Sequence, residues 1–319
     1  MNFWYVQHLT LAARLLLPLS WLAGVIAKRR FRQRRPGKYG VPLLVVGNLT
    51  VGGTGKSPAI QALVSHLQSR GLRCGIVSRG YGGHSNHYPL AIMSDTDTSQ
   101  CGDEPKALAQ QLGCPVVVDP DRDRAVRYLV SQYPLDAVIS DDGLQHYRMG
   151  RDLELIMIDG VRGLGNARLL PAGPLREPVS RLTTVQWRVA KGQRPTDLDV
   201  DAVLTLNPQW PANGQGEPLP EEAKIRACAG IGYPDGFYRQ LTDQGFRVQA
   251  THSPGDHRPV PPDWLSDASL PLVLTEKDAI KLTKPWPGHC YVVRLQPELP
   301  ADFLDTIESA LRSTQRWKS

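Results

Sequence analysis

A glycine-rich segment followed by lysine and serine is the part of this sequence best suited to phosphate chemistry. Backbone N–H groups of such a loop can surround phosphate oxygens, while Lys56 neutralises the β- and γ-phosphates and the Ser57 hydroxyl binds Mg²⁺. Thr50 stands where the usual pattern begins with glycine. The residues predicted to bind ATP are Leu49, Thr50, Val51, Gly52, Gly53, Thr54, Gly55, Lys56 and Ser57.

The flanking residues supply the strand and the helix that a phosphate-binding loop needs. Residues 43–46 are an apolar run typical of a buried strand, and residues 58–70 place apolar side chains at helical spacing. A helix that begins at the loop adds a favourable dipole for phosphate. This context disfavours the alternative, an ordinary glycine-rich turn that happens to precede a lysine, and it predicts a nucleotide site.

Two pairs of acidic residues could complete a phosphoryl-transfer site. Asp141 and Asp142 follow the apolar residues 137–139, as expected of carboxylates that hold Mg²⁺ between two phosphates. The alternative is a solvated pair at the end of a strand. Asp103 and Glu104 begin a predicted helix, where Asp103 either caps the helix or acts as a base on an attacking hydroxyl. The residues alone leave both roles open.

Two loops rich in proline carry further candidates. His257 follows an aspartate in residues 253–262, where it is either a surface residue or a catalytic group brought in by closure of a second lobe. Arg176 and Glu177 lie in residues 170–178, where they could stabilise transferring charge and assist the metal, or form an ion pair at a rim. Residues 275–278 lack the order required to specify guanine, so we expect ATP rather than GTP.

The composition excludes several classes of protein. Five cysteines are scattered without a C-x-x-C pair, which argues against a zinc site or a disulfide framework. Residues 1–38 carry eight Lys and Arg and no Asp or Glu, so the rest of the chain carries −2 of the total charge of +6. The basicity is therefore one N-terminal block, and a nucleic-acid surface is not predicted.

The N-terminal block follows a mostly apolar segment, residues 3–27. A cleaved signal peptide fits poorly because the positive charge follows the apolar run, and a spanning helix fits poorly because Arg14 lies inside it. Gln7, Thr10 and Arg14 would share one face of a helix lying in the membrane interface, with the basic residues against anionic headgroups. We favour this peripheral or monotopic arrangement over a helix packed on the protein's own body.

The remaining chain alternates apolar runs with helical segments, and polar residues collect where the runs end. This order predicts an α/β protein, a P-loop NTPase-like doubly wound parallel sheet with its ligand crevice at the carboxyl ends of the strands. We expect an N-terminal membrane segment at 1–38, a nucleotide-binding core at 39–207, a linker at 208–222 and a smaller α/β lobe at 223–319.

Several of these motifs together resemble the tetraacyldisaccharide 4′-kinase family over nearly the whole chain. The matching segments are Val46-Gly-Asn-Leu-Thr-Val-Gly-Gly-Thr-Gly-Lys-Ser-Pro58, Ser78-Arg-Gly-Tyr-Gly82, Gly102-Asp-Glu-Pro105, Asp141-Asp-Gly-Leu-Gln-His146, Leu170-Pro-Ala-Gly-Pro-Leu-Arg-Glu177, Ala229-Gly-Ile-Gly232 and Thr275-Glu-Lys-Asp-Ala279. The family shares the threonine before its glycines. This sequence departs from the family at Arg258, where a second histidine is common, and in residues 183–188, which lack an Ala-Asp pair.

The resemblance implies transfer of the γ-phosphoryl of ATP, with Mg²⁺, to the 4′-hydroxyl of an acylated diglucosamine 1-phosphate, the lipid A disaccharide precursor. It places the reaction at the cytoplasmic face of a Gram-negative inner membrane. It also implies roles for five side chains, with Asp103 as the base. His257 would be its partner in a closed form. Asp142, Arg176 and Glu177 would join the catalytic group, and the metal would be held by Ser57, Asp141 and Glu177.

Two other classes of function remain as alternatives. A membrane-associated P-loop ATPase that drives assembly or partitioning would hydrolyse ATP without an acceptor. An adaptor that uses nucleotide as a switch would tolerate the loss of Asp103. The sequence does not specify the acyl-chain preference or the oligomeric state.

Overall fold

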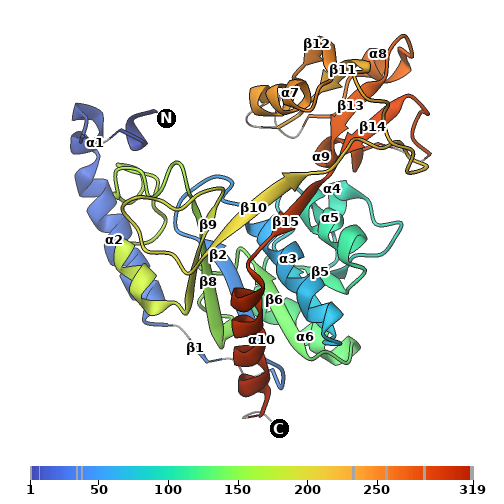
Figure 1. Cartoon of the computed structure of the whole chain (residues 1–319). Helices are drawn as coiled ribbons and strands as arrows, with labels where there is room; N and C mark the ends of the chain where they lie inside the picture. The colour runs from blue at the N-terminus through green and yellow to red at the C-terminus, as the bar shows by residue number, and fades with distance from the viewer. Residues whose placement is uncertain are drawn as a thin grey trace. The chain divides into compact units, whose positions relative to one another are not determined.

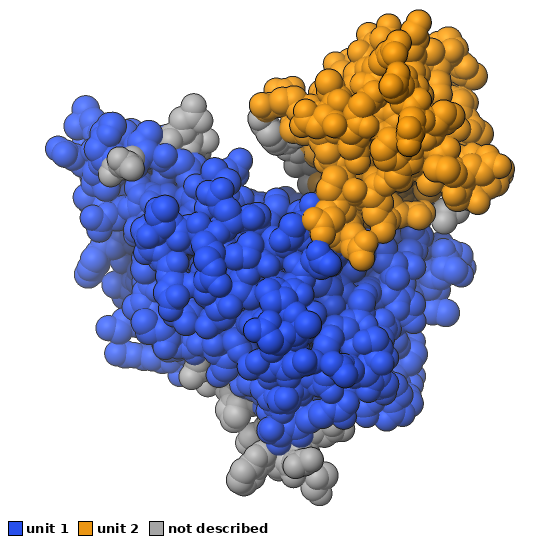
Figure 2. Space-filling view, in the orientation of Figure 1, with its two compact units in different colours: residues 1–206, 297–319 blue, residues 207–296 orange. Residues whose placement is uncertain are grey.

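The computed structural model describes residues 2–6, 8–33, 35–36, 39–231, 234–255, 258–282 and 285–316. The chain forms two compact units, residues 1–206 with 297–319 and residues 207–296, which Figure 2 colours separately. The expected boundaries differ from this division in three places, the first being that residues 1–38 are grouped with the core in the first unit. Residues 208–222 belong to the second unit, where Leu219 is buried in its core, and the C-terminal helix belongs to the first.

The first unit is built on a nine-stranded sheet in the order β15-β10-β9-β8-β2-β6-β3-β5-β4 (Figure 1). The pairings from β10 to β5 are parallel, and β4 pairs antiparallel with β5. The central strands are buried over their whole length, as expected of a parallel sheet covered on both faces. The strands are β2 (Leu43–Asn48), β3 (Cys74–Ser78), β4 (Leu90–Ala91), β5 (Val116–Val118), β6 (Ala137–Asp141), β8 (Leu153–Asp159), β9 (Trp187–Lys191), β10 (Ala202–Pro208) and β15 (Leu295–Glu298). The predicted α/β fold with a large parallel sheet is confirmed.

Helices cover both faces of this sheet. Successive side chains of one strand therefore pack alternately in two apolar cores, one on each face. On β2, Leu44 and Val46 pack in the core that contains residues of α3, α5 and α10, whereas Leu43 and Val45 pack in the core that contains residues of α6. The helices are α3 (Lys56–Ser69), α4 (Thr98–Cys101), α5 (Asp103–Leu112), α6 (Arg122–Gln132) and α10 (Ala301–Arg316), with the 3₁₀ helix η2 (Val179–Thr184). A short pair of strands, β1 (Arg35–Pro36) and β7 (Gly150–Arg151), lies outside the large sheet.

The N-terminal segment forms η1 (Asn2–Trp4), α1 (Leu11–Leu15) and α2 (Leu17–Phe31). Its small residues face the protein: Ala13 is fully buried, and the Ser20 hydroxyl donates to the carbonyl of Leu169. The expected polar stripe through Gln7, Thr10 and Arg14 is wrong at Thr10, which caps α1 by accepting from the Ala13 N–H, and Gln7 lies outside the described residues. No helix among the described residues is long and apolar enough to cross a membrane.

The second unit has a four-stranded parallel sheet in the order β12-β11-β13-β14. Its elements are β11 (Lys224–Cys228), α7 (Pro234–Asp243), β12 (Arg247–His252), α8 (Pro262–Ser266), β13 (Leu272–Thr275), α9 (Glu276–Ala279) and β14 (Cys290–Val293). The chain enters this unit from β10 and leaves it into β15, which are neighbouring strands of the large sheet. The predicted smaller α/β lobe is therefore present as an insertion.

Candidate active site

The predicted phosphate-binding loop leaves the end of β2 and runs directly into α3. Gly55 occupies the N-cap position of α3 with φ of +86°, a left-handed conformation that glycine adopts without a Cβ penalty. Gly52 also has a positive φ, of +103°. The side-chain amide of Asn48 donates to the carbonyls of Thr50, at 2.9 Å, and Gly52, at 3.3 Å. Asn48 therefore holds the loop in its curve.

A second loop fixes the first from outside. The Val51 N–H donates to the Pro174 carbonyl at 2.9 Å, and the Arg176 N–H donates to the Leu49 carbonyl at 2.6 Å. The Arg176 guanidinium then forms a two-pronged pair with Asp142, with distances of 2.9 and 3.1 Å, and also donates to Asn48. Lys56 lies 3.8 Å from the Asp142 carboxylate. The geometry thus brings three predicted site residues, Lys56, Asp142 and Arg176, into one cluster.

Asp141 and Asp142 meet opposite electrostatic surroundings. Asp141 is the last residue of β6, which pairs with β2, and burial raises its pKa to about 6 against the opposing effect of Lys56. Burial also acts to raise the pKa of Asp142, but the Lys56 and Arg176 charges outweigh it and leave that pKa below its usual value. Asp142 has a positive φ of 49°, held by its N–H bond to the Val46 carbonyl. The two carboxylates are therefore suited to different roles.

The oxygen atoms around Asp141 fit a magnesium ion. One Asp141 oxygen accepts from the Ser78 hydroxyl at 3.1 Å, while its other oxygen is buried without a hydrogen-bond partner. The Ser57 hydroxyl lies 3.4 Å from a carboxylate oxygen of Glu104. Hydroxyl and carboxylate oxygens are the ligands that Mg²⁺ prefers. Ser57 and Asp141 are thus suited to hold the ion, and Glu104 adds a carboxylate that the sequence did not assign to it.

Asp103 lies in the first turn of α5, whose N-cap is Gly102, so the alternative of Asp103 as the capping residue is wrong. The position of Asp103 is fixed by a close approach between residues 80–83 and Gly102, the residue before it. A Cβ on Gly102 would lie 2.4 Å from the Tyr81 carbonyl oxygen, and a Cβ on Gly83 would lie 2.5 Å from the Gly102 nitrogen. The two backbones therefore touch, which no side chain would permit. The contact between Ser57 and Glu104 brings this end of α5 beside the start of α3.

A cavity of about 550 Å³ adjoins Asp142 and Arg176 within the first unit. One part of its wall is apolar and comes from α2 through Ala23, Ile26 and Ala27, and four arginines supply positive charge elsewhere in the wall. Arg122 is buried in that wall, and desolvation followed by the charge of Arg79 lowers its pKa. Such a cavity suits a ligand that is part apolar and part anionic. The other lining residues are Arg30, Arg79, Pro120, Gln145, His146, Tyr147, Leu170, Leu175 and Glu177.

Glu177 lines this cavity but is engaged by neighbouring side chains. It accepts from the Tyr147 hydroxyl at 2.5 Å and pairs with Arg181 at 3.2 Å, while Arg181 also pairs with Glu154. Burial raises the pKa of Glu177, and Tyr147 and Arg181 oppose that rise. These contacts hold Glu177 within the 170–178 loop, and its role as a metal ligand stays a prediction.

The structure and the sequence differ on which residues form the site. His257 lies outside the described residues. Sequence reasoning gave no role to Asn48 and Arg122, and considered Glu104 only beside Asp103. Asn48 does lie inside a motif of the family resemblance. Arg122 had no sequence signal, because it lies on α6 outside every motif.

Comparison with known proteins decides the family. A family model described as tetraacyldisaccharide-1-P 4′-kinase matches residues 12–312. The chain belongs to this family. Tetraacyldisaccharide 4′-kinases from Actinobacillus succinogenes and Azotobacter vinelandii are 40% and 42% identical, covering 97% of this chain each and 98% and 95% of the relatives. A crystal structure of LpxK from Aquifex aeolicus in complex with ATP has a TM-score of 0.79 at 26% identity, covering 94% of this chain and 100% of that one.

Membership of the tetraacyldisaccharide 4′-kinase family confirms the resemblance on which the function was predicted. The chain is an ATP-dependent kinase of lipid A biosynthesis. The alternatives of an assembly ATPase and of a non-enzymatic adaptor are thereby disfavoured. The clustering of Lys56, Asp142 and Arg176 agrees with a kinase, since phosphoryl transfer is catalysed mainly by positioning and by stabilisation of charge.

Proposed function

We propose that the 4′-hydroxyl of an acylated diglucosamine 1-phosphate is phosphorylated where the phosphate-binding loop meets the cavity beside α2. The observation that carries the proposal is the lining of that cavity. Asp142 and Arg176 line the cavity, and α2 supplies an apolar wall. Acyl chains suit the apolar wall, and a sugar phosphate suits the guanidinium groups of Arg79 and Arg122.

Each residue of the site then has a step to perform. The loop N–H groups and Lys56 bind the β- and γ-phosphates, and Mg²⁺ held by Ser57 and Asp141 would neutralise charge on their oxygens. Asp103 accepts the proton of the attacking hydroxyl as the new oxygen–phosphorus bond forms and ADP leaves. Arg176, fixed by Asp142, stabilises charge on the transferred group. We retain His257 as a candidate partner of Asp103.

The same proposal places the enzyme on an anionic membrane surface, at the cytoplasmic face of the inner membrane. Large apolar side chains are exposed along α1 and α2, although other residues of these helices pack on the protein. The basic residues Lys28, Arg29 and Arg30 form the last turn of α2. Apolar side chains can enter the interface while basic ones meet anionic headgroups. The exposed residues are Leu11, Leu15, Leu19, Trp21, Leu22, Val25 and Ile26.

The test is transfer of labelled phosphate from ATP to purified tetraacyldisaccharide 1-phosphate in detergent. We expect a labelled bisphosphorylated lipid with the wild type, and a loss of at least about a hundredfold in kcat with Asp103→Ala, since a positioned base contributes about 10²–10⁴-fold. Asp95→Ala is the matched control, because Asp95 is exposed and lies in the preceding loop.

Two outcomes would contradict the proposal in different ways. Free phosphate released without acceptor, and no labelled lipid, would return the assembly ATPase to first place. Full activity of Asp103→Ala would leave the kinase in place and remove Asp103 as its base.

A further inference from the structure

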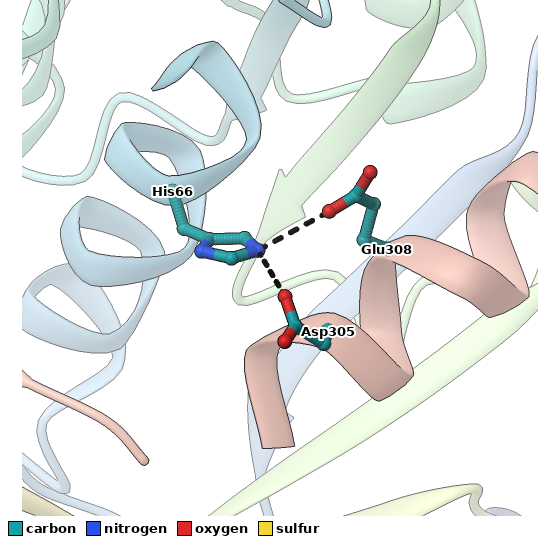
Figure 3. A group of neighbouring side chains, drawn as sticks. All are labelled: His66, Asp305 and Glu308. Carbon is teal, nitrogen blue, oxygen red and sulfur yellow. Dashed lines mark ion pairs between the residues drawn. The ribbon is translucent and has the colours of Figure 1, made fainter. Parts of the chain in front are cut away.

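A histidine and two carboxylates from opposite ends of the chain meet away from the phosphate-binding loop. His66 lies on α3, and Asp305 and Glu308 lie on α10 (Figure 3). The spacing of three residues puts both carboxylates on one face of α10. Among the residues that the structure describes, this is the one group of three or more His, Cys, Asp or Glu side chains whose ligand atoms all lie within 4.8 Å of one another.

The distances in this group are longer than those of ordinary hydrogen bonds. The Nε2 atom of His66 lies 3.4 Å from Asp305 Oδ1 and 3.3 Å from Glu308 Oε2. This nitrogen is buried and has no hydrogen-bond partner, although an N–H···O bond usually measures about 2.9–3.0 Å. A tetrahedral Zn²⁺ site with bonds of about 2.0–2.1 Å has ligand atoms about 3.3–3.4 Å apart. The two separations from His66 therefore match two edges of such a site.

We propose that His66, Asp305 and Glu308 form a Zn²⁺ site that joins α3 to α10, separate from the catalytic magnesium. The imidazole nitrogen favours Zn²⁺ over Mg²⁺, which prefers oxygen ligands only. A water molecule would complete the tetrahedron on the open side, since half of the Asp305 side chain is exposed. The ion would fix the later turns of the helix whose first residue is the phosphate-binding Lys56.

Two arginines also contact the carboxylates, so a cation must compete with them for the carboxylate oxygens. Arg312 pairs with Oε1 of Glu308 at 2.8 Å, which leaves Oε2 for the metal. Arg70 lies 2.9 Å from the same Asp305 oxygen that faces His66, and 3.8 Å from Glu308 Oε2. The Arg70 side chain is half exposed, so it can move into solvent when a cation binds. Removal of Arg70 should therefore strengthen metal binding.

The experiment titrates metal-free, nucleotide-free full-length protein with Co²⁺, followed by displacement with Zn²⁺. We expect one tight equivalent per chain, with the visible absorption of tetrahedral Co²⁺, and a rise in Tm on addition of Zn²⁺. His66→Ala should weaken binding by more than about tenfold, because loss of even an outer partner of a ligand costs about 10–100-fold. Arg70→Ala should bind more tightly than the wild type.

His87→Ala is the matched control, since His87 is an exposed histidine whose backbone hydrogen-bonds to Ser85. It should bind Co²⁺ as the wild type does. Absence of a tight equivalent, or Co²⁺ binding that survives His66→Ala, would overturn the proposal and leave an ion-pair network. Weaker binding by Arg70→Ala would overturn it as well. The measurement on Arg70→Ala stays informative if His66→Ala fails to fold. ATP binding by each variant shows independently whether that variant has folded.

Discussion

Asp141 and Asp142 are adjacent in sequence, yet the protein treats their charges in opposite ways. Asp141 is buried at the end of β6 with a raised pKa, and Asp142 faces Lys56 and Arg176 with a lowered one. A metal ion needs an ionised carboxylate, so a bound cation would offset the cost of burying the Asp141 charge, which Lys56 offsets only in part. The unfavourable burial of Asp141 thereby favours the metal-bound protein over the metal-free protein.

Asp141→Asn should make the metal-free protein more stable at neutral pH and inactive. A carboxyl with a folded pKa near 6 binds more protons in the native state than in the unfolded state between about pH 4 and 6, so stability falls as the pH rises through that window. Asparagine does not ionise, so it avoids this loss in the free energy of unfolding. The loss amounts to roughly 3 kcal/mol for a pKa shift of about two units. Thermal unfolding without Mg²⁺ at pH 5 and pH 8 would check it. A variant with a lower Tm than the wild type at pH 8 would contradict the prediction.

Arg176→Lys should lower kcat by at least tenfold although the charge is retained. The guanidinium of Arg176 makes two parallel bonds to Asp142, and a lysine ammonium reproduces neither the fork nor its spacing. Arg73→Lys is the control, because Arg73 makes the same two-pronged pair with Asp136 on the surface. Steady-state kinetics of the two variants would separate local catalysis from loss of an ion pair. Equal effects would argue against a catalytic Arg176.

At the scale of elements, α2 has two different faces. Gly24 and Ser20 lie against Leu169, and the Phe31 ring contacts Tyr147 and Arg181, so the helix is part of the first unit. The side chains of Trp21 and Leu22 point away, with 73% and 51% of their surface exposed. Of the two alternatives that the sequence left, the helix packed on the body is observed, and the exposed face leaves the interfacial helix a prediction.

Replacement of Trp21 and Leu22 by glutamine should weaken binding to vesicles that contain anionic lipid. Each side chain contributes roughly 1.5–3 kcal/mol when it is fully buried in an apolar phase, so the double variant should bind more than tenfold less tightly. Val161→Gln is the matched control, because Val161 is exposed on another loop of the unit. Vesicle co-sedimentation measures the effect. Unchanged binding would assign membrane affinity to the basic residues alone.

The strands that carry the site could be predicted from the sequence, and others could not. The apolar runs at residues 43–46 and 137–139 predicted β2 and β6, and the polar residues after the second run located Asp141 and Asp142. The edge strand β15 and its neighbour β10 were missed because they have few buried residues and end in exposed ones. Asn48 accepts from Arg176 of another loop, and Arg122 meets the charges of Arg79 and Asp142, and no local pattern records such contacts.

At the scale of the whole molecule, the C-terminal helix completes the first unit rather than the second. Ile307 and Leu311 of α10 are fully buried in the core that also holds residues of α3. The sequence placed this helix with the smaller lobe because it follows that lobe along the chain. Sequence order is a weak guide where one unit is inserted into another, since the parts of the outer unit are then separated by the whole insert.

A chain that ends at residue 296 should fail to form a stable first unit. The truncation exposes the apolar surface that α10 covers, and loss of each large buried side chain costs about 2–5 kcal/mol against a total stability of about 5–15 kcal/mol. Limited proteolysis and thermal unfolding would show the loss. Removal of only residues 317–319 is the control and should leave the Tm unchanged. A truncated chain that still bound ATP and unfolded cooperatively would contradict the prediction.

The position of the insert also sets an order of events during synthesis. Strands β2 to β10 leave the ribosome first, then the whole of residues 207–296, and β15 and α10 come last. Domains generally fold as units as they emerge, so the inserted unit can fold before the unit that surrounds it is complete. A nascent chain would therefore carry its phosphate-binding loop for most of its synthesis with the surface that α10 covers still exposed. We expect the complete first unit, and with it stable ATP binding, to form only once α10 has been made.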